Sequence, residues 1–218
     1  CHVNAGATAN LGGGSLGNAN FNTGVEDLPD QPARLTTQKV PRDDGFRTPG
    51  DGTFNVPPLV EAADSGPFFH NNAIETIEGA VAFYDGEAFN KSPAGLALAK
   101  LDPEGKGIEL DGTQIVAIAA FLRVINVLEN IRQSIMLLEA SLAVSSSAER
   151  ARLLTRAVRE TDDSTRVLTG GGLHAEAVAH LHEARRLADR ALRSHFFGRK
   201  HTEEAIQEQK KARAFLVE

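Results

Sequence analysis

The spacing of apolar residues changes sharply along the chain. From about residue 126 onward, Ala, Leu, Arg and Glu dominate, and apolar residues recur every three or four positions. That period is typical of amphipathic helices, and short breaks between such helices favour an antiparallel bundle. The pattern predicts helices near 114–144, 148–168, 174–197 and 202–217, separated by Ser145–Ser147, Gly170–Gly172 and Gly198.

The first part of the chain lacks this period. Residues 1–66 are rich in Gly, Asn, Pro and Asp, which is the composition of loops. A loop of this length is uncommon in a compact domain unless another group organises it. Within this part, the pattern predicts one helix at 73–85 with Thr76 as its N-cap, and a return to loop at 90–112.

These patterns together predict a mainly α protein with two parts. We expect a loop-rich domain at residues 1–128 and an antiparallel helical bundle at residues 129–218. Asp111 is a suitable N-cap for the long helix that begins near Gln114 and crosses this division.

Composition and charge narrow the classes of function. Hydrophobic residues make up 41% of the 218 positions, which is enough for a packed core. The formal net charge is −6 and no strongly basic segment occurs, so nucleic acid is not an expected partner. Arg123 and Asn126 interrupt the densest apolar run, Ile115–Val127, which is shorter than the roughly 20 residues of a membrane span. We therefore expect no membrane-spanning segment.

The only cysteine of the chain is Cys1, and His2 follows it directly. The motif C-x-x-C-H attaches haem c, and its last two residues are Cys and His. Because the sequence starts inside such a pattern, we expect that the protein's N-terminal part is missing. A neighbouring Cys and His can also occur by accident. Residues further along the chain must therefore show whether this pair belongs to a haem-attachment motif.

Four downstream segments occur in an order that resembles a known family. They carry the patterns F-x-x-P-x-L, P-F-F-H-N-N, T-I-E-G-A-V and A-F-L, and they lie at Phe54–Leu59, Pro67–Asn72, Thr76–Val81 and Ala120–Leu122. In this order they resemble the C-terminal haem domain of the bacterial dihaem cytochrome c peroxidases and of the related methylamine-utilisation dihaem enzyme. The resemblance covers residues 1–128 and implies a cytochrome c-like fold that binds haem c.

The resemblance also implies the groups that hold the haem. Cys1 maps onto the second thioether link and His2 onto the proximal iron ligand. The family's sixth ligand lies fourteen positions after the loop histidine, and that position after His70 is Tyr84. The peroxidases have Met there, whereas the methylamine-utilisation enzyme has Tyr. A phenolate ligand stabilises ferric iron, so this reading implies a low-potential haem. The alternative is that Tyr84 is a helix tyrosine with a hydrogen-bonded hydroxyl.

Three further positions take roles from the resemblance. His70 maps onto a histidine near the haem propionates, where ordering of the loop is a more probable role than catalysis. The backbone carbonyls of Ser65 and Pro67 map onto ligands of a calcium ion, whose oxygen preference suits such groups. Asn72 replaces the family's loop glycine, and asparagine tolerates a positive φ angle.

Three functions follow, two that use haem and one that does not. The first is an electron-transfer domain of a peroxidase-like periplasmic oxidoreductase. Its second haem, in the missing half, would reduce peroxide, so no catalytic residue is expected in this chain. The alternative is a periplasmic electron carrier that uses the bundle to dock a small redox protein. The third is a haem-free structural domain. For the bundle, the sequence leaves open packing on the haem domain, formation of a homodimer and binding of a partner.

Two other features have simpler explanations. His174, His180 and His182 fall in one predicted helix at spacings that do not share a face, which favours a solvated helix over a metal site. Met136, the only methionine, lies outside the region of resemblance and is therefore not expected to bind the haem iron.

Overall fold

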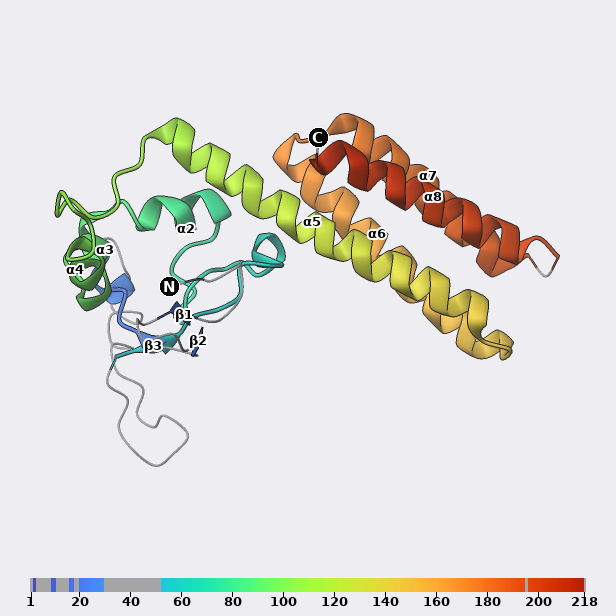
Figure 1. The fold of residues 1–218 in the computed structure, drawn as a ribbon, viewed down its shortest axis with the longest axis horizontal. Coiled ribbons are helices and arrows are strands. Elements are labelled where there is room, and N and C mark those ends of the chain that lie inside the picture. Colours follow the sequence, from blue (N-terminus) through green and yellow to red (C-terminus); the bar gives the residue numbers. More distant parts are fainter. Residues whose placement is uncertain are drawn as a thin grey trace, which may run out of the picture. The chain divides into compact units, whose positions relative to one another are not determined.

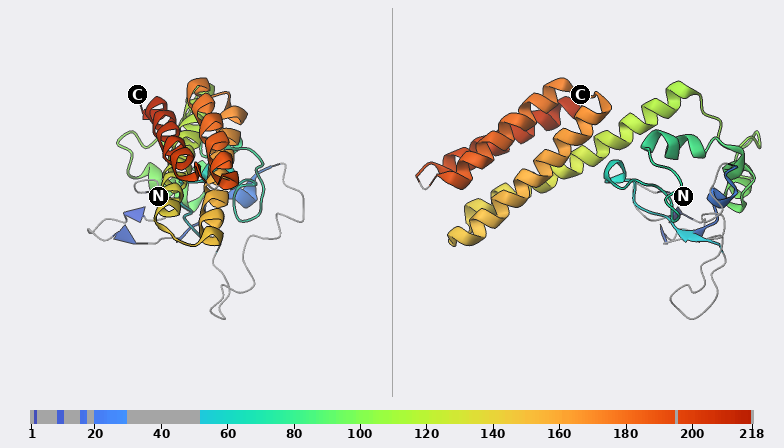
Figure 2. Two further views of the ribbon diagram at one scale, coloured as in Figure 1. Left: turned by 90° about the vertical axis from the view of Figure 1, so that its right-hand side faces the viewer. Right: turned by 180° about the vertical axis from the view of Figure 1, so that it is seen from behind.

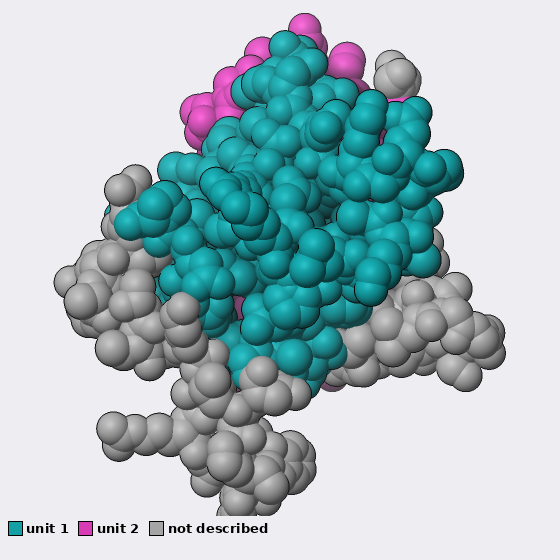
Figure 3. All heavy atoms as spheres, turned by 90° about the vertical axis from the view of Figure 1, so that its left-hand side faces the viewer, with its two compact units in different colours: residues 1–119 teal, residues 120–218 magenta. Residues whose placement is uncertain are grey.

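The structure is a computed structural model that describes residues 2, 9–10, 16–17, 20–29, 52–194 and 196–217. The described residues are mainly helical (Figure 1), which confirms the expected mainly α class. The chain forms two compact units, residues 1–119 (unit 1) and residues 120–218 (unit 2), coloured teal and magenta in Figure 3. The division between them falls within the long helix α5 (Gly112–Ala143), as does the expected division after residue 128.

Unit 1 contains short antiparallel strand pairs. Strand β1 (Ala9–Asn10) pairs with β2 (Leu16–Gly17), and β3 (Asn20–Phe21) pairs with β4 (Phe54–Asn55). The second pair joins residues 20–29 to residues 52–60, which are distant in sequence. Two short 3-10 helices follow these strands, η1 (Val25–Asp27) after β3 and η2 (Ala62–Asp64) after β4.

The helix expected at 73–85 is confirmed as α2 (Ile77–Phe83). Its N-cap is Thr76, whose hydroxyl oxygen accepts a hydrogen bond from the backbone N–H of Gly79 at 3.1 Å. This contact satisfies one of the N–H groups that a helix start leaves without a partner. The helix ends at Tyr84, which is its C-cap.

The expected loop at 90–112 is wrong in its first part. Two short helices lie here, α3 (Glu87–Asn90) and α4 (Pro93–Ala99). The second begins with an N-cap at Ser92, whose hydroxyl accepts a hydrogen bond from Gly95 N at 3.0 Å, and with a proline at the first helical position. A Ser-Pro pair therefore starts a helix at this point, although it is also common in loops.

The core of unit 1 packs η1 against α2, α3 and α4. Its buried apolar residues are Val25, Phe83, Phe89 and Ala94. Close approach between α3 and α4 depends on Gly95, because a Cβ atom there would lie 2.1 Å from the carbonyl oxygen of Phe89. Gly24 has a φ angle of +72° and lies against Ala88, which places η1 beside α3.

Unit 2 is a bundle formed by the second part of α5 with α6 (Ser147–Gly171), α7 (Ala175–Arg193) and α8 (Gly198–Val217). Figures 1 and 2 show these helices running antiparallel to their neighbours. Helix α6 continues through the expected break and ends at Gly172, where φ is +64°. Helix α8 begins at Gly198 and therefore earlier than the expected start at Thr202.

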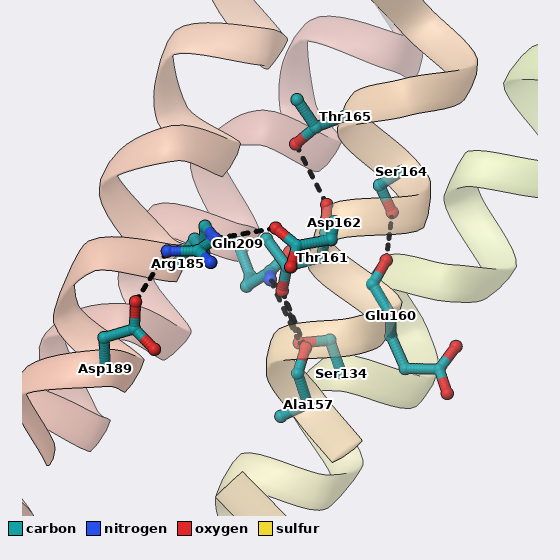
Figure 4. A network of polar contacts seen from close by, with 10 residues as sticks. All are labelled: Ser134, Ala157, Glu160, Thr161, Asp162, Ser164, Thr165, Arg185, Asp189 and Gln209. Carbon is teal, nitrogen blue, oxygen red and sulfur yellow. Dashed lines mark hydrogen bonds and ion pairs between the residues drawn. The ribbon is translucent and has the colours of Figure 1, made fainter. Parts of the chain in front are cut away.

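The core of unit 2 is rich in alanine, which lets the helices approach closely. Its buried apolar residues are Leu138, Leu154, Ala157, Leu187, Ala188, Ala191, Ala205 and Ile206. Figure 4 shows a polar layer in which the amide of Gln209 donates hydrogen bonds to Ser134 Oγ at 3.0 Å and Thr161 Oγ1 at 2.6 Å. This layer links α5, α6 and α8 within the core.

Ion pairs on the surface join α6 to α7. Arg185 lies 2.7 Å from Asp162 and 2.6 Å from Asp189, so one guanidinium bridges a residue of each helix (Figure 4). All three side chains retain substantial exposure, and such exposed pairs contribute little to stability.

Helix α5 is long and apolar enough to cross a membrane, judged by its length and composition alone. A single helix of this kind is weak evidence, because the core helix of a soluble protein gives the same pattern. The expectation that the chain has no membrane-spanning segment therefore stays a prediction.

Candidate cofactor site in unit 1

The loop that carries His70 has a closely defined backbone. The N–H of Phe68 donates a hydrogen bond to the carbonyl oxygen of Ile74 at 2.7 Å, which closes the loop at its base. Phe69 and Asn72 have φ angles of +67° and +54°. Asn72 therefore adopts a positive φ angle, which asparagine tolerates, as expected from the sequence.

His70 is held between an aromatic ring and a carboxylate. Its ring stacks on that of Phe54, with centroids 3.5 Å apart and an interplanar angle of 5°. Its Nε2 atom lies 2.9 Å from Oε1 of Glu26, a residue that is 7% exposed. Burying a carboxylate is costly unless it has a partner, so the contact with His70 offsets part of the cost of burying Glu26.

Glu26 was not among the residues expected to act in this site. It lies in η1, and no motif connects it with His70. The two residues meet because the β3–β4 pair aligns Phe21 with Phe54 and so brings their segments together. The only local sign that the Glu26 side chain is buried is its position in the sequence between the apolar residues Val25 and Leu28.

Tyr84 lies in a cluster of aromatic rings. Its ring centroid is 4.8 Å from that of Phe89, 5.5 Å from that of Phe83 and 6.2 Å from that of Phe69. Phe69 is the neighbour of His70 in the chain and also makes an edge contact with Phe83 at 4.6 Å. The loop of His70 and the end of α2 therefore meet in one apolar cluster.

The phenol of Tyr84 is in an environment that disfavours its charge. Burial raises the pKa of Tyr84 above its usual value of 10.0. Its hydroxyl makes no hydrogen bond to any residue in the described part of the chain. Both readings of Tyr84, as an iron ligand and as a helix tyrosine with a hydrogen-bonded hydroxyl, stay predictions.

The residues expected to attach the haem are only partly described. Cys1 lies outside the described residues. His2 is half-buried, and its Nδ1 atom is shielded from solvent. Their roles as thioether and iron ligand, and the pairing of His2 with Tyr84 across an iron atom, stay predictions.

The proposed calcium ligands lie in an exposed turn. Ser65 and Pro67 are both exposed, and the Ser65 hydroxyl donates a hydrogen bond to the carbonyl oxygen of Glu61 at 2.9 Å. Among the described residues, no group of three or more His, Cys, Asp or Glu side chains is placed to hold a metal ion. The proposed calcium ligands are backbone carbonyls and not side chains, so calcium binding by Ser65 and Pro67 stays a prediction.

The histidines of the bundle and Met136 lie in unit 2. His180 is half-buried, with its Nδ1 atom 2.6 Å from Glu208 and its ring stacked on Phe215 at 5.5 Å. Burial opposes ionisation of Glu208, but Lys211 and His180 outweigh it and lower the pKa of that carboxyl. The expectation of a solvated helix therefore needs correction for His180, which has specific partners on α8. Met136 is 54% exposed on α5.

Comparisons with known proteins give no match: no family model, no curated protein and no solved structure is similar to this chain.

Proposed function

We propose that unit 1 is a cytochrome c-like haem domain that transfers electrons in a dihaem cytochrome c peroxidase-like oxidoreductase. The observation that carries the proposal is the position of Tyr84, whose ring packs among Phe69, Phe83 and Phe89 and whose hydroxyl makes no hydrogen bond to a described residue.

The residues of this chain have separate tasks toward the haem. Cys1 would attach it, and His2 and Tyr84 would be the ligands of its iron. The bound haem would supply one-electron chemistry. Because burial raises the pKa of Tyr84, its phenol holds its proton more firmly than a free tyrosine does, and a role as iron ligand would require loss of that proton.

Two protein ligands on one iron explain the division of labour in this proposal. With His2 and Tyr84 as ligands, the iron would leave no free position for peroxide, so this domain would relay electrons to or from a second haem domain. A small periplasmic redox protein would be the electron donor. Calcium at the carbonyls of Ser65 and Pro67 would order the turn beside the loop of His70.

The alternative function is a periplasmic electron carrier without peroxidase activity. Its support is that the bundle forms a compact unit of its own, which suits a docking module. Turnover of hydrogen peroxide with a reduced donor separates the two functions. A haem-loaded protein that is reduced and reoxidised but does not consume peroxide is a carrier.

The haem proposal is tested with a form of the protein that carries a complete C-x-x-C-H motif ending at His2. We expect a Soret band and a pyridine haemochrome spectrum typical of haem c. Tyr84→Phe should change the ferric visible spectrum, because it removes the phenol oxygen and keeps the ring. Met136→Leu is the matched control and should leave the spectrum unchanged.

Two results would contradict the proposal at different points. A colourless protein would exclude haem binding altogether. A coloured protein whose ferric spectrum is identical in wild type and Tyr84→Phe would keep the haem but remove Tyr84 as its ligand.

A further inference from the structure

A hollow lies at one end of the bundle. The α5–α6 and α7–α8 turns both lie at this end (Figures 1 and 2). The volume of the hollow is about 250 Å³, and its lining comes from Leu142, Ser147, Arg150, Ala151, Leu154, Ala191, Leu192, Ser194, Phe196, Gly198, Arg199 and Thr202. All these residues belong to unit 2, and the hollow has the volume of about eight water molecules.

One wall of the hollow is apolar. Leu154 is fully packed in the core at 1% exposure, and Leu142 and Leu192 are partly buried beside it. Phe196, by contrast, is 93% exposed at the rim. An exposed phenylalanine beside an apolar hollow loses unfavourable contact with water when an apolar group binds there.

Two arginines line the same hollow. Arg150 donates hydrogen bonds to the carbonyl oxygens of Ser141 at 3.3 Å and Val144 at 2.9 Å, and it makes no ion pair with a carboxylate of the described residues. Arg199 lies 3.0 Å from Glu203, in an exposed pair that solvent screens. Among the described residues, no carboxylate therefore neutralises the charge of Arg150.

The dipoles of the helices around the hollow do not favour a bound charge of either sign. Helices α6 and α8 begin at this end and α5 and α7 finish there, so their dipoles oppose one another. The carbonyls at the end of α5 are already engaged by Arg150. The side chains of Arg150 and Arg199 consequently set the preference for an anion.

We propose that this hollow binds a small amphipathic carboxylate. Its carboxylate would lie between Arg150 and Arg199, and its apolar body would lie against Leu142, Leu154 and Phe196. The volume suits a single short chain or one aromatic ring. This proposal does not depend on haem, because every residue that it uses lies in unit 2.

The test uses octanoate and the full chain, with binding followed by calorimetry. Octan-1-ol and octyltrimethylammonium have the same apolar chain with a neutral and a positive head. We expect octanoate to bind more tightly than either, and more weakly as salt is added. Arg150→Gln and Arg199→Gln should each weaken octanoate binding by about tenfold, through loss of a charge-assisted hydrogen bond. Arg152→Gln, on the same helix but outside the lining, should leave the affinity unchanged.

A variant that fills the hollow provides a second test, which remains valid if the loss of Arg150 disturbs the end of α5. Ala151 is exposed and lines the hollow, so Ala151→Phe should fill it and abolish octanoate binding. Ala148→Phe, at an exposed position outside the lining, is its control and should bind normally. Equal affinities for octanoate and octan-1-ol, or full binding by Ala151→Phe, would overturn the proposal.

Discussion

Oε1 of Glu26 and Nε2 of His70 lie 2.9 Å apart, and this contact joins η1 to the loop that follows η2. Glu26 is 7% exposed, and its only ion-pair partner among the described residues is His70. The stack of His70 on Phe54 holds the imidazole from a second direction. A buried charge and an aromatic ring, both from segments distant in sequence, therefore fix one histidine.

Removing the imidazole should destabilise unit 1. His70→Ala leaves the Glu26 carboxylate buried without its partner, so we expect the free energy of unfolding to fall by about 2–3 kcal/mol. Urea unfolding followed by tyrosine fluorescence measures this change. Tyr84 is the single tyrosine of a chain without tryptophan, so its fluorescence reports on unit 1 alone.

A double-mutant cycle separates the contact from the loss of packing. Glu26→Gln removes the charge that His70→Ala leaves buried, so the double variant should be more stable than the sum of the single losses predicts. The expected coupling is at least about 0.5 kcal/mol. Strict additivity would show that the contact adds nothing to stability. His182→Ala, at an exposed position in unit 2, is the control for loss of a histidine.

The phenol of Tyr84 should ionise later in the folded chain than in the unfolded chain. Burial raises its folded pKa above the usual 10.0, so between the two pKa values the unfolded state has lost a proton that the folded state keeps. The free energy of unfolding therefore falls as pH rises through about 10. Ultraviolet absorbance of the phenolate, recorded with and without urea, gives both pKa values.

Tyr84→Phe provides the control for this pH dependence. The variant lacks the ionisable group and breaks no hydrogen bond to a described residue, so it should keep its stability near neutral pH and lose the component due to Tyr84 above pH 10. Equal phenol pKa values in the folded and unfolded chains would contradict the burial that raises the pKa of Tyr84.

The sequence predicted the long helices well, because they combine apolar period with recognisable ends. Thr76 and Asp111 both act as the N-cap residues expected, and Asp111 Oδ1 accepts a hydrogen bond from Gln114 N at 2.8 Å. Helix α3 was missed because four residues are too few to show a period, and α4 because the Ser-Pro pair at its start is also common in loops. Their stability depends on tertiary packing, including the close contact at Gly95.

The candidate site was less predictable from the sequence than the helices were. His70 and Tyr84 could be singled out by motif order, but their shared aromatic cluster depends on Phe69, whose side chain had no assigned role. Glu26 could not be found, since its contact with His70 requires the pairing of β3 with β4. Contacts between distant segments of a loop-rich unit leave no periodic trace in the sequence.

Gly95, the single glycine of α4, should not be replaceable without a loss of stability. In Gly95→Ala the new methyl group would lie 2.1 Å from the carbonyl oxygen of Phe89, so α3 and α4 would have to separate. We expect a loss of about 2–3 kcal/mol, the upper part of the range for overpacking. Gly112→Ala is the matched control, because nothing lies within 4 Å of the added atom and the residue begins a helix. It should change stability by less than about 1 kcal/mol. Similar losses in both variants would show that the α3–α4 contact can relax.

Substitutions in the polar layer of the bundle can separate the contribution of side-chain volume to stability from that of hydrogen bonding. Gln209 is fully buried, and its amide nitrogen donates to Ser134 and Thr161, whose hydroxyls also reach the carbonyl oxygen of Ala157 at 3.1 Å and 2.8 Å. Its Oε1 atom has no hydrogen-bond partner among the described residues. The cost of burying this acceptor without a partner offsets part of the stabilisation from the two hydrogen bonds that Gln209 donates.

Two substitutions at Gln209 should therefore differ in cost. Gln209→Ala leaves a cavity and should lower the free energy of unfolding by about 2–4 kcal/mol. Gln209→Leu fills most of the space, removes the unsatisfied acceptor and leaves both hydroxyls bonded to Ala157, so it should cost about 1 kcal/mol or less. Urea unfolding followed by helical circular dichroism measures both, with the exposed Gln207→Ala as a control that should change stability by less than about 0.5 kcal/mol. If Gln209→Leu cost as much as Gln209→Ala, restoring the volume would recover no stability, and the hydrogen bonds that both variants lose would be the main contribution of Gln209.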